Sequence, residues 1–163
     1  MNHKRFKYIL LSICLMTLSC SIFSSGDSDD QEQQSLVDTQ WELVSFKVTE
    51  QGTLDGTIEP GVYEIPDEED YILEFMGESG VRGTFFCNSC VANYKIIPPD
   101  SISITEMGCT RAVCGFSNAI IDRVKYSKTF ELTQDNLILH YEADRFDGWH
   151  EKGNLYFKKM DME

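Results

Sequence analysis

Four cysteines in one short stretch constrain this chain more than any other feature of its sequence. They follow the spacing C-x2-C-x18-C-x4-C, at Cys87, Cys90, Cys109 and Cys114. Two strand-like runs, 92–97 and 101–107, lie between the two pairs and are separated by two prolines and an aspartate. We therefore expect a strand meander whose two ends are joined through sulfur.

The cysteine spacing leaves three chemistries open. Two short pairs are typical of a tetrahedral zinc site, they form two disulfides in an oxidising compartment, and Cys87-Asn88-Ser89-Cys90 has redox spacing. A redox thiolate of low pKa is favoured at a helix N-terminus, whereas this motif lies between strand-like runs. We favour two disulfides, because disulfides persist outside the cytoplasm and the chain begins with an export signal. We accordingly expect no metal and no cofactor.

The N-terminus has the features of that signal. Three basic residues precede an apolar run, 8–18, which is too short to cross a bilayer comfortably as a helix. A serine and Cys20 follow, and together they resemble the end of a bacterial lipoprotein signal, in which the cysteine is lipidated and becomes the mature N-terminus. We predict a signal peptide over 1–19 and lipidation at Cys20. Secretion with cleavage at another bond is the alternative.

In the next stretch, 20–38, residues 21–35 are rich in serine, aspartate and glutamine and contain almost no large apolar side chains. Such a composition does not bury enough surface to fold, so we expect a lipidated N-terminus followed by a flexible acidic tether. The lipid would attach the protein to a bacterial membrane in the cell envelope, on the periplasmic or the cell-surface side.

The charge of the chain restricts its partners. The whole sequence has a net charge of −13, and removal of 1–19 leaves 11 basic and 27 acidic residues, a net charge of −16. Nucleic acid binding requires a basic face, so we exclude it. Attachment to a membrane would come from the lipid and not from charge.

The folded part is expected over 39–160, followed by a short tail, 161–163. Alternating apolar residues predict strands at 41–48, 71–76, 81–87, 92–97, 101–107, 128–133, 137–142 and 154–159, and 62–65 is a candidate for a short extra strand. One segment, 113–124, changes to helical spacing. The sequence therefore predicts an α+β, mainly β fold: a compact domain of about seven or eight twisted antiparallel strands with one short helix packed on one side.

The expected core consists of the apolar side chains on one face of these elements. Its members are Trp41, Leu43, Leu73, Phe75, Phe85, Ile102, Ile104, Ile120, Leu137, Leu139 and Phe157. This is enough apolar surface for a domain that folds without a metal.

Several short motifs resemble one known family. They are Trp41-x-Leu43, Gly83-x-x-x-Cys87-Asn88, Thr105-x-Met107-x-Cys109 and the late strand Leu137-Ile138-Leu139. Together they resemble the META domain (HslJ-like) family of exported bacterial proteins and lipoproteins. The resemblance implies a compact domain of twisted antiparallel strands with a helix on one side. It implies no reaction, since the family has no established catalytic residues.

The resemblance also implies a cysteine pairing. Four cysteines allow three connectivities. Cys87 and Cys109 belong to the motifs shared with the family, whereas Cys90 and Cys114 are additions in this chain. We therefore predict the disulfides Cys87–Cys109 and Cys90–Cys114.

Two classes of function remain open. The first is a non-catalytic binding or interaction module with an unknown protein or small-molecule partner. The alternative is a small lipocalin-like carrier, a β-barrel with an apolar ligand inside. The sequence contains no G-x-S-x-G, H-E-x-x-H or nucleotide fingerprint, so we do not expect an enzyme. His150, beside Trp149, is a candidate for the mouth of a ligand site, and His140 is expected to face outward from a strand.

Overall fold

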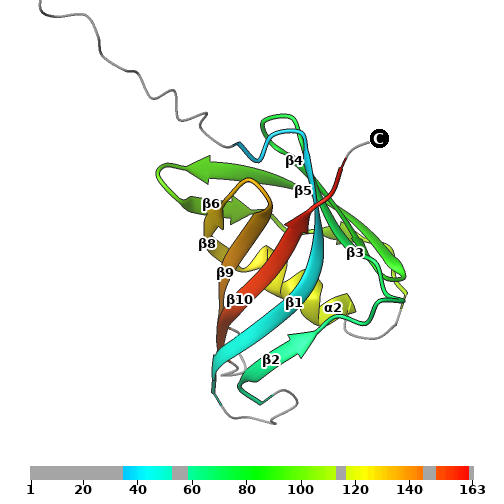
Figure 1. The fold of residues 1–163 in the computed structure, drawn as a ribbon, viewed down its shortest axis with the longest axis vertical. Coiled ribbons are helices and arrows are strands. Elements are labelled where there is room, and N and C mark those ends of the chain that lie inside the picture. The colour runs from blue at the N-terminus through cyan, green and yellow to red at the C-terminus, as the bar shows by residue number, and fades with distance from the viewer. Residues whose placement is uncertain (1–34, 53–58, 113–116, 145–149, 162–163) are drawn as a thin grey trace, which may run out of the picture. The chain divides into compact units, whose positions relative to one another are not determined.

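Ten strands and one helix make up the described part of the chain (Figure 1). The computed structural model describes residues 35–52, 59–112, 117–144 and 150–161. The elements are β1 (Thr39–Gln51), β2 (Gly61–Glu64), β3 (Tyr71–Met76), β4 (Gly80–Phe85), β5 (Asn88–Ile97), β6 (Ser101–Ile104), β7 (Gly108–Cys109), α2 (Ser117–Lys125), β8 (Ser127–Leu132), β9 (Asn136–Asp144) and β10 (His150–Lys159).

Eight of the strands close into an antiparallel barrel. Their order around the ring is β1-β3-β4-β5-β6-β8-β9-β10, and β10 pairs with β1 along most of both strands. The remaining two are attached to the ring, β2 along β1 and β7 along β5. The junction between β6 and β8 is the thinnest, with one paired position, Ser101 opposite Thr129. The mainly β fold with one short helix is confirmed, and closure of the barrel is more specific than the sequence predicted.

Alternating side chains fill the inside of the ring, and all eleven predicted core residues are buried. The pairing of β1 with β10 has two register shifts, and the first interrupts the inward-facing run of side chains. Trp41 and Leu43 point inward, the register shifts between Leu43 and Ser45, and Phe46 and Val48 then point inward. A bulge of this kind inserts one residue into the strand, so Leu43 and Phe46 both point inward although they are three positions apart. The long strand therefore supplies apolar side chains to the core over most of its length.

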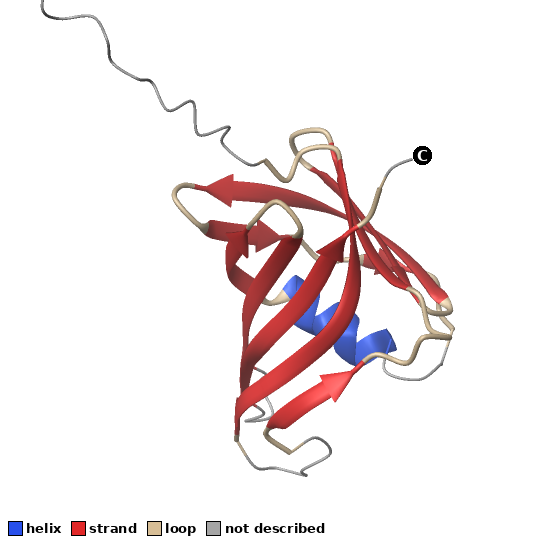
Figure 2. Ribbon diagram, in the orientation of Figure 1, coloured by secondary structure: helices blue, strands red, loops and turns tan. Residues whose placement is uncertain are grey.

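The helix differs from the prediction in its place. It was expected to pack on one side of the sheet, but α2 lies between the wall formed by β1, β9 and β10 and the wall formed by β3, β4 and β5 (Figure 2). Ile120 and Val124 on the inner face of α2 are fully buried, and Ser117 Oγ donates to the carbonyl of Phe85 at 2.8 Å. The helix thus covers the opening where the walls diverge. Among the described residues, no helix is long and apolar enough to cross a membrane.

Candidate functional site

The sulfur chemistry of the chain is centred on β5 and β7. Cys90 and Cys109 form a disulfide and stand directly opposite each other in the strand pairing, with their Cα atoms 4.1 Å apart. The predicted pairing, Cys87–Cys109 with Cys90–Cys114, is therefore wrong. Cys87 is also disulfide-bonded, and Cys114 lies outside the described residues. Because a disulfide sulfur is no longer a thiolate, the bond is incompatible with a zinc site made of all four cysteines.

The observed Cys90–Cys109 pairing follows from where β5 begins. The sequence placed the start of this strand at Ala92, whereas the strand begins at Asn88 and includes Cys90. Cys87 instead lies in the two-residue turn between β4 and β5, after Phe86, whose φ is +53°. A cysteine in this turn lies outside the stretch that pairs with β7. The register of the strands thus selects Cys90 as the partner of Cys109.

Asn88 holds the loop that follows the disulfide. Its side chain is buried, and its Nδ2 donates to the Ala112 carbonyl at 2.9 Å while its Oδ1 accepts from the Ala112 N–H at 3.0 Å. The hydroxyl of Thr110 donates to the same Oδ1 at 3.2 Å and accepts from the N–H of Ser89 at 3.0 Å. One amide side chain thus supplies a donor and an acceptor to a segment more than twenty residues away. The sequence identified Asn88 only as part of a motif and missed this role.

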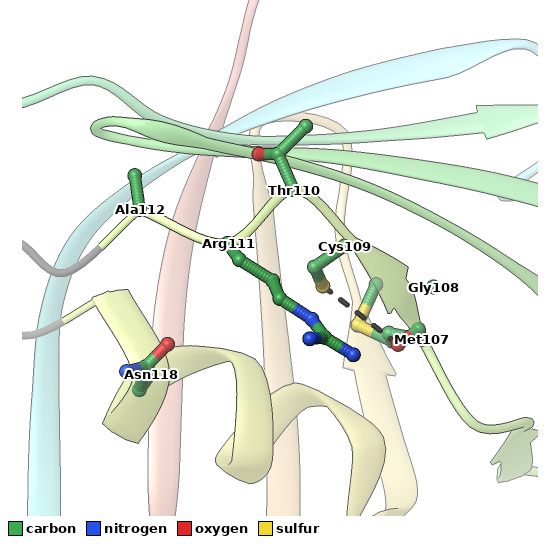
Figure 3. A pocket seen from close by; sticks show the side chains of 7 residues that line it. All are labelled: Met107, Gly108, Cys109, Thr110, Arg111, Ala112 and Asn118. Atoms are coloured by element: carbon green, nitrogen blue, oxygen red, sulfur yellow. Dashed lines mark hydrogen bonds between the residues drawn. The ribbon is translucent and has the colours of Figure 1, made fainter.

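A groove of about 510 Å³ lies between this loop and the start of α2 (Figure 3). Its lining residues are Met107, Gly108, Cys109, Thr110, Arg111, Ala112 and Asn118. The exposed side chain of Arg111 extends from the loop into the space beside the helix, and Asn118 borders that space from α2. A guanidinium, an amide, backbone groups and the sulfur atoms of the floor together suit a ligand with an anionic group and an apolar part.

A second polar cluster is buried beneath α2. Arg123 and Glu151 are 2% and 1% exposed, and they form a two-point ion pair, with Nε to Oε1 at 2.7 Å and Nη2 to Oε2 at 3.2 Å. Tyr141 donates its hydroxyl to Oε1 of Glu151 at 2.7 Å. The guanidinium carbon lies 4.6 Å from the ring centre of Phe46. These contacts join α2 to β9, β10 and β1, so the cluster fixes the helix in the barrel opening.

The electrostatics of this cluster follow from its burial. Burial raises the pKa of Tyr141, Arg123 opposes this change, and the hydrogen bond to Glu151 adds to it. Nη1 of Arg123 has no hydrogen-bond partner in the described part of the protein. Gly153 makes the arrangement possible, because a Cβ there would lie 2.5 Å from the Tyr141 hydroxyl and still closer to the carbonyl of Lys47. Both charges of the pair are used within the fold, which gives the cluster a structural role.

The sequence contained a signal for this pair that was not used. Arg123 follows Ile120 by three positions on the buried face of the helix. Glu151 has the same parity as Gly153, Leu155 and Phe157, which all point inward from β10. Polar residues on an apolar face indicate a buried partner.

His140 and His150 lie apart from both clusters. Nδ1 of His150 is 2.8 Å from the carboxylate of Asp144, and Trp149 lies outside the described residues. His140 lies between two buried residues of β9 and contacts Asn154 at 2.8 Å and Glu131 at 3.1 Å. Within the described residues, no group of three or more histidine, cysteine or acidic side chains is arranged to hold a metal ion.

Comparisons with known proteins agree with this architecture. The META domain model matches residues 34–152. A solved structure of a DUF4847 family protein from Bacteroides vulgatus ATCC 8482 is similar over 77% of this chain and 95% of that chain, with a TM-score of 0.53 and 11% sequence identity. At this identity the likeness shows the fold alone. No curated protein matches the chain.

Proposed function

Because the chain belongs to the META domain family, we propose that it is a non-catalytic binding or interaction module, held in the cell envelope by a lipid on Cys20. The partner is an unknown protein or small molecule, and the membrane is engaged through the lipid. The export signal and the cysteine at its end support the location. The Cys90–Cys109 disulfide supports it too, since such bonds persist in oxidising compartments.

One observation carries the choice of a module over a carrier. The inward side chains of the ring and of α2 form one continuous buried cluster, from Trp41 in β1 through Leu73 in β3 to Leu139 in β9. A carrier encloses its ligand in an interior space of several hundred Å³. A closed barrel is the architecture of such carriers, but here α2 and its ion pair cover the opening. Recognition is therefore assigned to the outer surface.

The groove beside the disulfide is the proposed binding surface. It is bounded by a loop that a covalent bond and Asn88 hold in place, so little conformational freedom is lost when a ligand binds. Arg111 presents a cation in a chain with a net charge of −13, and this selects a ligand with a carboxylate or another anionic group.

Binding at the groove is tested with the full-length protein and a library of acidic peptides and small carboxylates. A ligand found in this way should bind at least about tenfold more weakly to Arg111→Glu, because the charge reversal removes one charge-assisted contact and adds a repulsion. Lys47→Glu is the matched control, since Lys47 is exposed on β1, away from the groove, and gives the same change of charge. Equal loss of affinity in both variants would argue against the groove.

The lipid anchor is tested by Cys20→Ala. The variant should be released from membranes after cleavage, or remain unprocessed, because the attached acyl chains supply the membrane affinity. Membrane fractionation and the mass of the mature protein provide the measurement. A Cys20→Ala protein that is cleaved normally and still sediments with membranes would show that the anchor is elsewhere.

A further inference from the structure

We propose that one end of the barrel is a membrane-contacting face, which rests on the bilayer to which the lipid on Cys20 attaches. This face, called here the tether end, comprises residues 35–39, the turns 77–79 and 133–135, the tip of the β5–β6 hairpin, 95–100, and residues 158–161 at the end of β10. The proposal rests on the lipid anchor proposed above and adds the orientation of the barrel on the membrane.

The point at which the chain enters the barrel is fixed at this end. Leu36 is 3% exposed, and its carbonyl accepts a hydrogen bond from the Thr39 hydroxyl. Asp38 accepts a hydrogen bond from the N–H of Gly77 at 2.8 Å, which joins the entering segment to the β3–β4 turn. Ser35, the first described residue, therefore lies at the tether end.

The other turns of this face are joined to the same point. Met160 donates its N–H to the carbonyl of Gln40, and Lys159 donates to the carbonyl of Asp135 in the β8–β9 turn, both at 2.9 Å. The β5–β6 hairpin projects from the barrel beside them (Figure 1). Several separate parts of the chain thus form one surface around the entry point.

Apolar side chains are exposed on this surface. Val37 is 38% exposed beside the entry point, and Ile97 is 49% exposed at the end of the projecting hairpin. Pro98 and Pro99, which follow Ile97 in the turn, are exposed as well. Short apolar groups of this kind enter the headgroup region of a bilayer when a second signal holds the protein there.

The length of the tether favours contact at this end. Fourteen residues lie between Cys20 and Ser35, and their composition predicts a tether that would span roughly 20 Å on average. A ten-residue strand such as β10 is about 33 Å long. The opposite end of the barrel, at the start of β10, is therefore farther from Ser35 than the average span expected for such a tether.

The charges of the tether end also suit an uncharged lipid surface. Lysine and acidic side chains are both exposed there, namely Lys95, Lys158, Lys159, Asp38, Glu78, Asp100, Asp135 and Asp161. With three cations and five anions, this face attracts anionic lipids no more than zwitterionic ones. The contact should therefore form on phosphatidylcholine, with the lipid anchor and the apolar side chains supplying the affinity.

The experiment places the full-length lipidated protein in phosphatidylcholine nanodiscs that contain spin-labelled headgroups. Co-elution with the nanodiscs is scored first, and relaxation enhancement at backbone amides is then measured. We expect strong enhancement at Val37 and Ile97 and little at Val62 in β2, which lies in the opposite half of the barrel. Val37→Glu and Ile97→Glu should reduce the enhancement at the tether end several-fold, and Val62→Glu, the matched control for Val37→Glu, should leave it unchanged.

The outcomes separate the orientation from the anchor. A protein that co-elutes and shows uniform enhancement, or stronger enhancement at Val62, overturns the membrane-contacting face and leaves the anchor intact. A protein that does not co-elute overturns the lipid anchor and the face with it. Selective enhancement that is insensitive to both glutamate substitutions also contradicts the contact, because the apolar side chains would then contribute nothing.

Discussion

Two polar regions stabilise the barrel by different means. Beneath α2, Arg123 and Glu151 are held by each other and by Tyr141, without a covalent bond. The second region, called here the flank, is the side of the barrel where β5 pairs with β7. There the Cys90–Cys109 disulfide and Asn88 fix a loop in which Thr110 and Arg111 are exposed. In the first region both charges are paired with each other inside the fold. In the second region Arg111 stays exposed beside a groove. The second region is therefore held rigid without using the guanidinium of Arg111, the group proposed to contact a ligand.

The largest effect is expected at the buried pair. Glu151→Gln should lower the free energy of unfolding by about 3–5 kcal/mol, because Arg123 would remain buried without a compensating charge. Urea unfolding provides the measurement. Glu142→Gln is the control, since Glu142 is half-exposed and contacts Lys152 at the surface, and it should leave stability nearly unchanged. Similar losses of stability in the two variants would show that breaking the buried ion pair costs no more than breaking a surface pair.

The disulfide should contribute somewhat less. Its cysteines are 19 residues apart, and replacing both by alanine should cost about 3 kcal/mol, chiefly because the unfolded chain gains freedom. Peptide mapping of the unreduced protein checks the pairing. Only one of the three connectivities of these four cysteines contains Cys90–Cys109. Its other bond is Cys87–Cys114, and we predict this as the second disulfide. Recovery of a Cys87–Cys109 peptide would contradict the account of the flank.

A glycine in each region sharpens the comparison. Gly153→Ala should cost about 1–3 kcal/mol, because the new Cβ would collide with the Lys47 carbonyl and the Tyr141 hydroxyl. Gly108→Ala on the flank should have almost no effect, since the nearest atom to its Cβ would be 3.9 Å away. Thermal unfolding of the two variants provides the measurement. Equal shifts in Tm would mean that packing is no tighter beneath α2 than on the flank.

The smallest effect is a pH dependence at Tyr141. Burial raises its pKa above the ordinary value of 10.0, so the folded protein keeps the proton when the unfolded chain begins to lose it. The stability that this tyrosine contributes is therefore complete below about pH 10 and declines as the pH rises further. The difference in unfolding free energy between the native protein and Tyr141→Phe should stay constant up to about pH 10 and shrink as the pH rises above it. A constant difference would contradict this.

The sequence predicted the strands and the core well because both depend on local alternation. Leu73 and Phe75 are buried as expected, because the alternation of apolar residues with a period of two along β3 can be read directly from the sequence. The place of α2 was not predictable in this way, because it depends on how the two walls of the barrel diverge. The disulfide was assigned wrongly because the pairing was taken from the family motifs, which do not show which cysteines stand opposite each other in paired strands. The start of β5 was also placed four residues too late, so Cys90 was not expected within that strand.

In the candidate site, too, local patterns indicate the face on which a residue lies but not the residue that it contacts. Arg123 and Glu151 lie on the inward faces of a helix and a strand, but their meeting requires the tertiary fold. The role of Asn88 likewise depends on Ala112, which lies 24 residues further along the chain. Arg111 gave no signal in the sequence at all, because an isolated exposed arginine becomes informative only once the groove around it is known.

A filled barrel that binds its partner on the outside is the central claim, and titration with an apolar fluorescent fatty acid tests it most directly. The full-length protein is titrated while amide shifts of Leu73 and Leu139, both fully buried, are followed by NMR. We predict no saturable binding and no shift of these interior amides. Saturable binding of one molecule per chain with shifts at both residues would contradict the claim and would identify the barrel as a carrier.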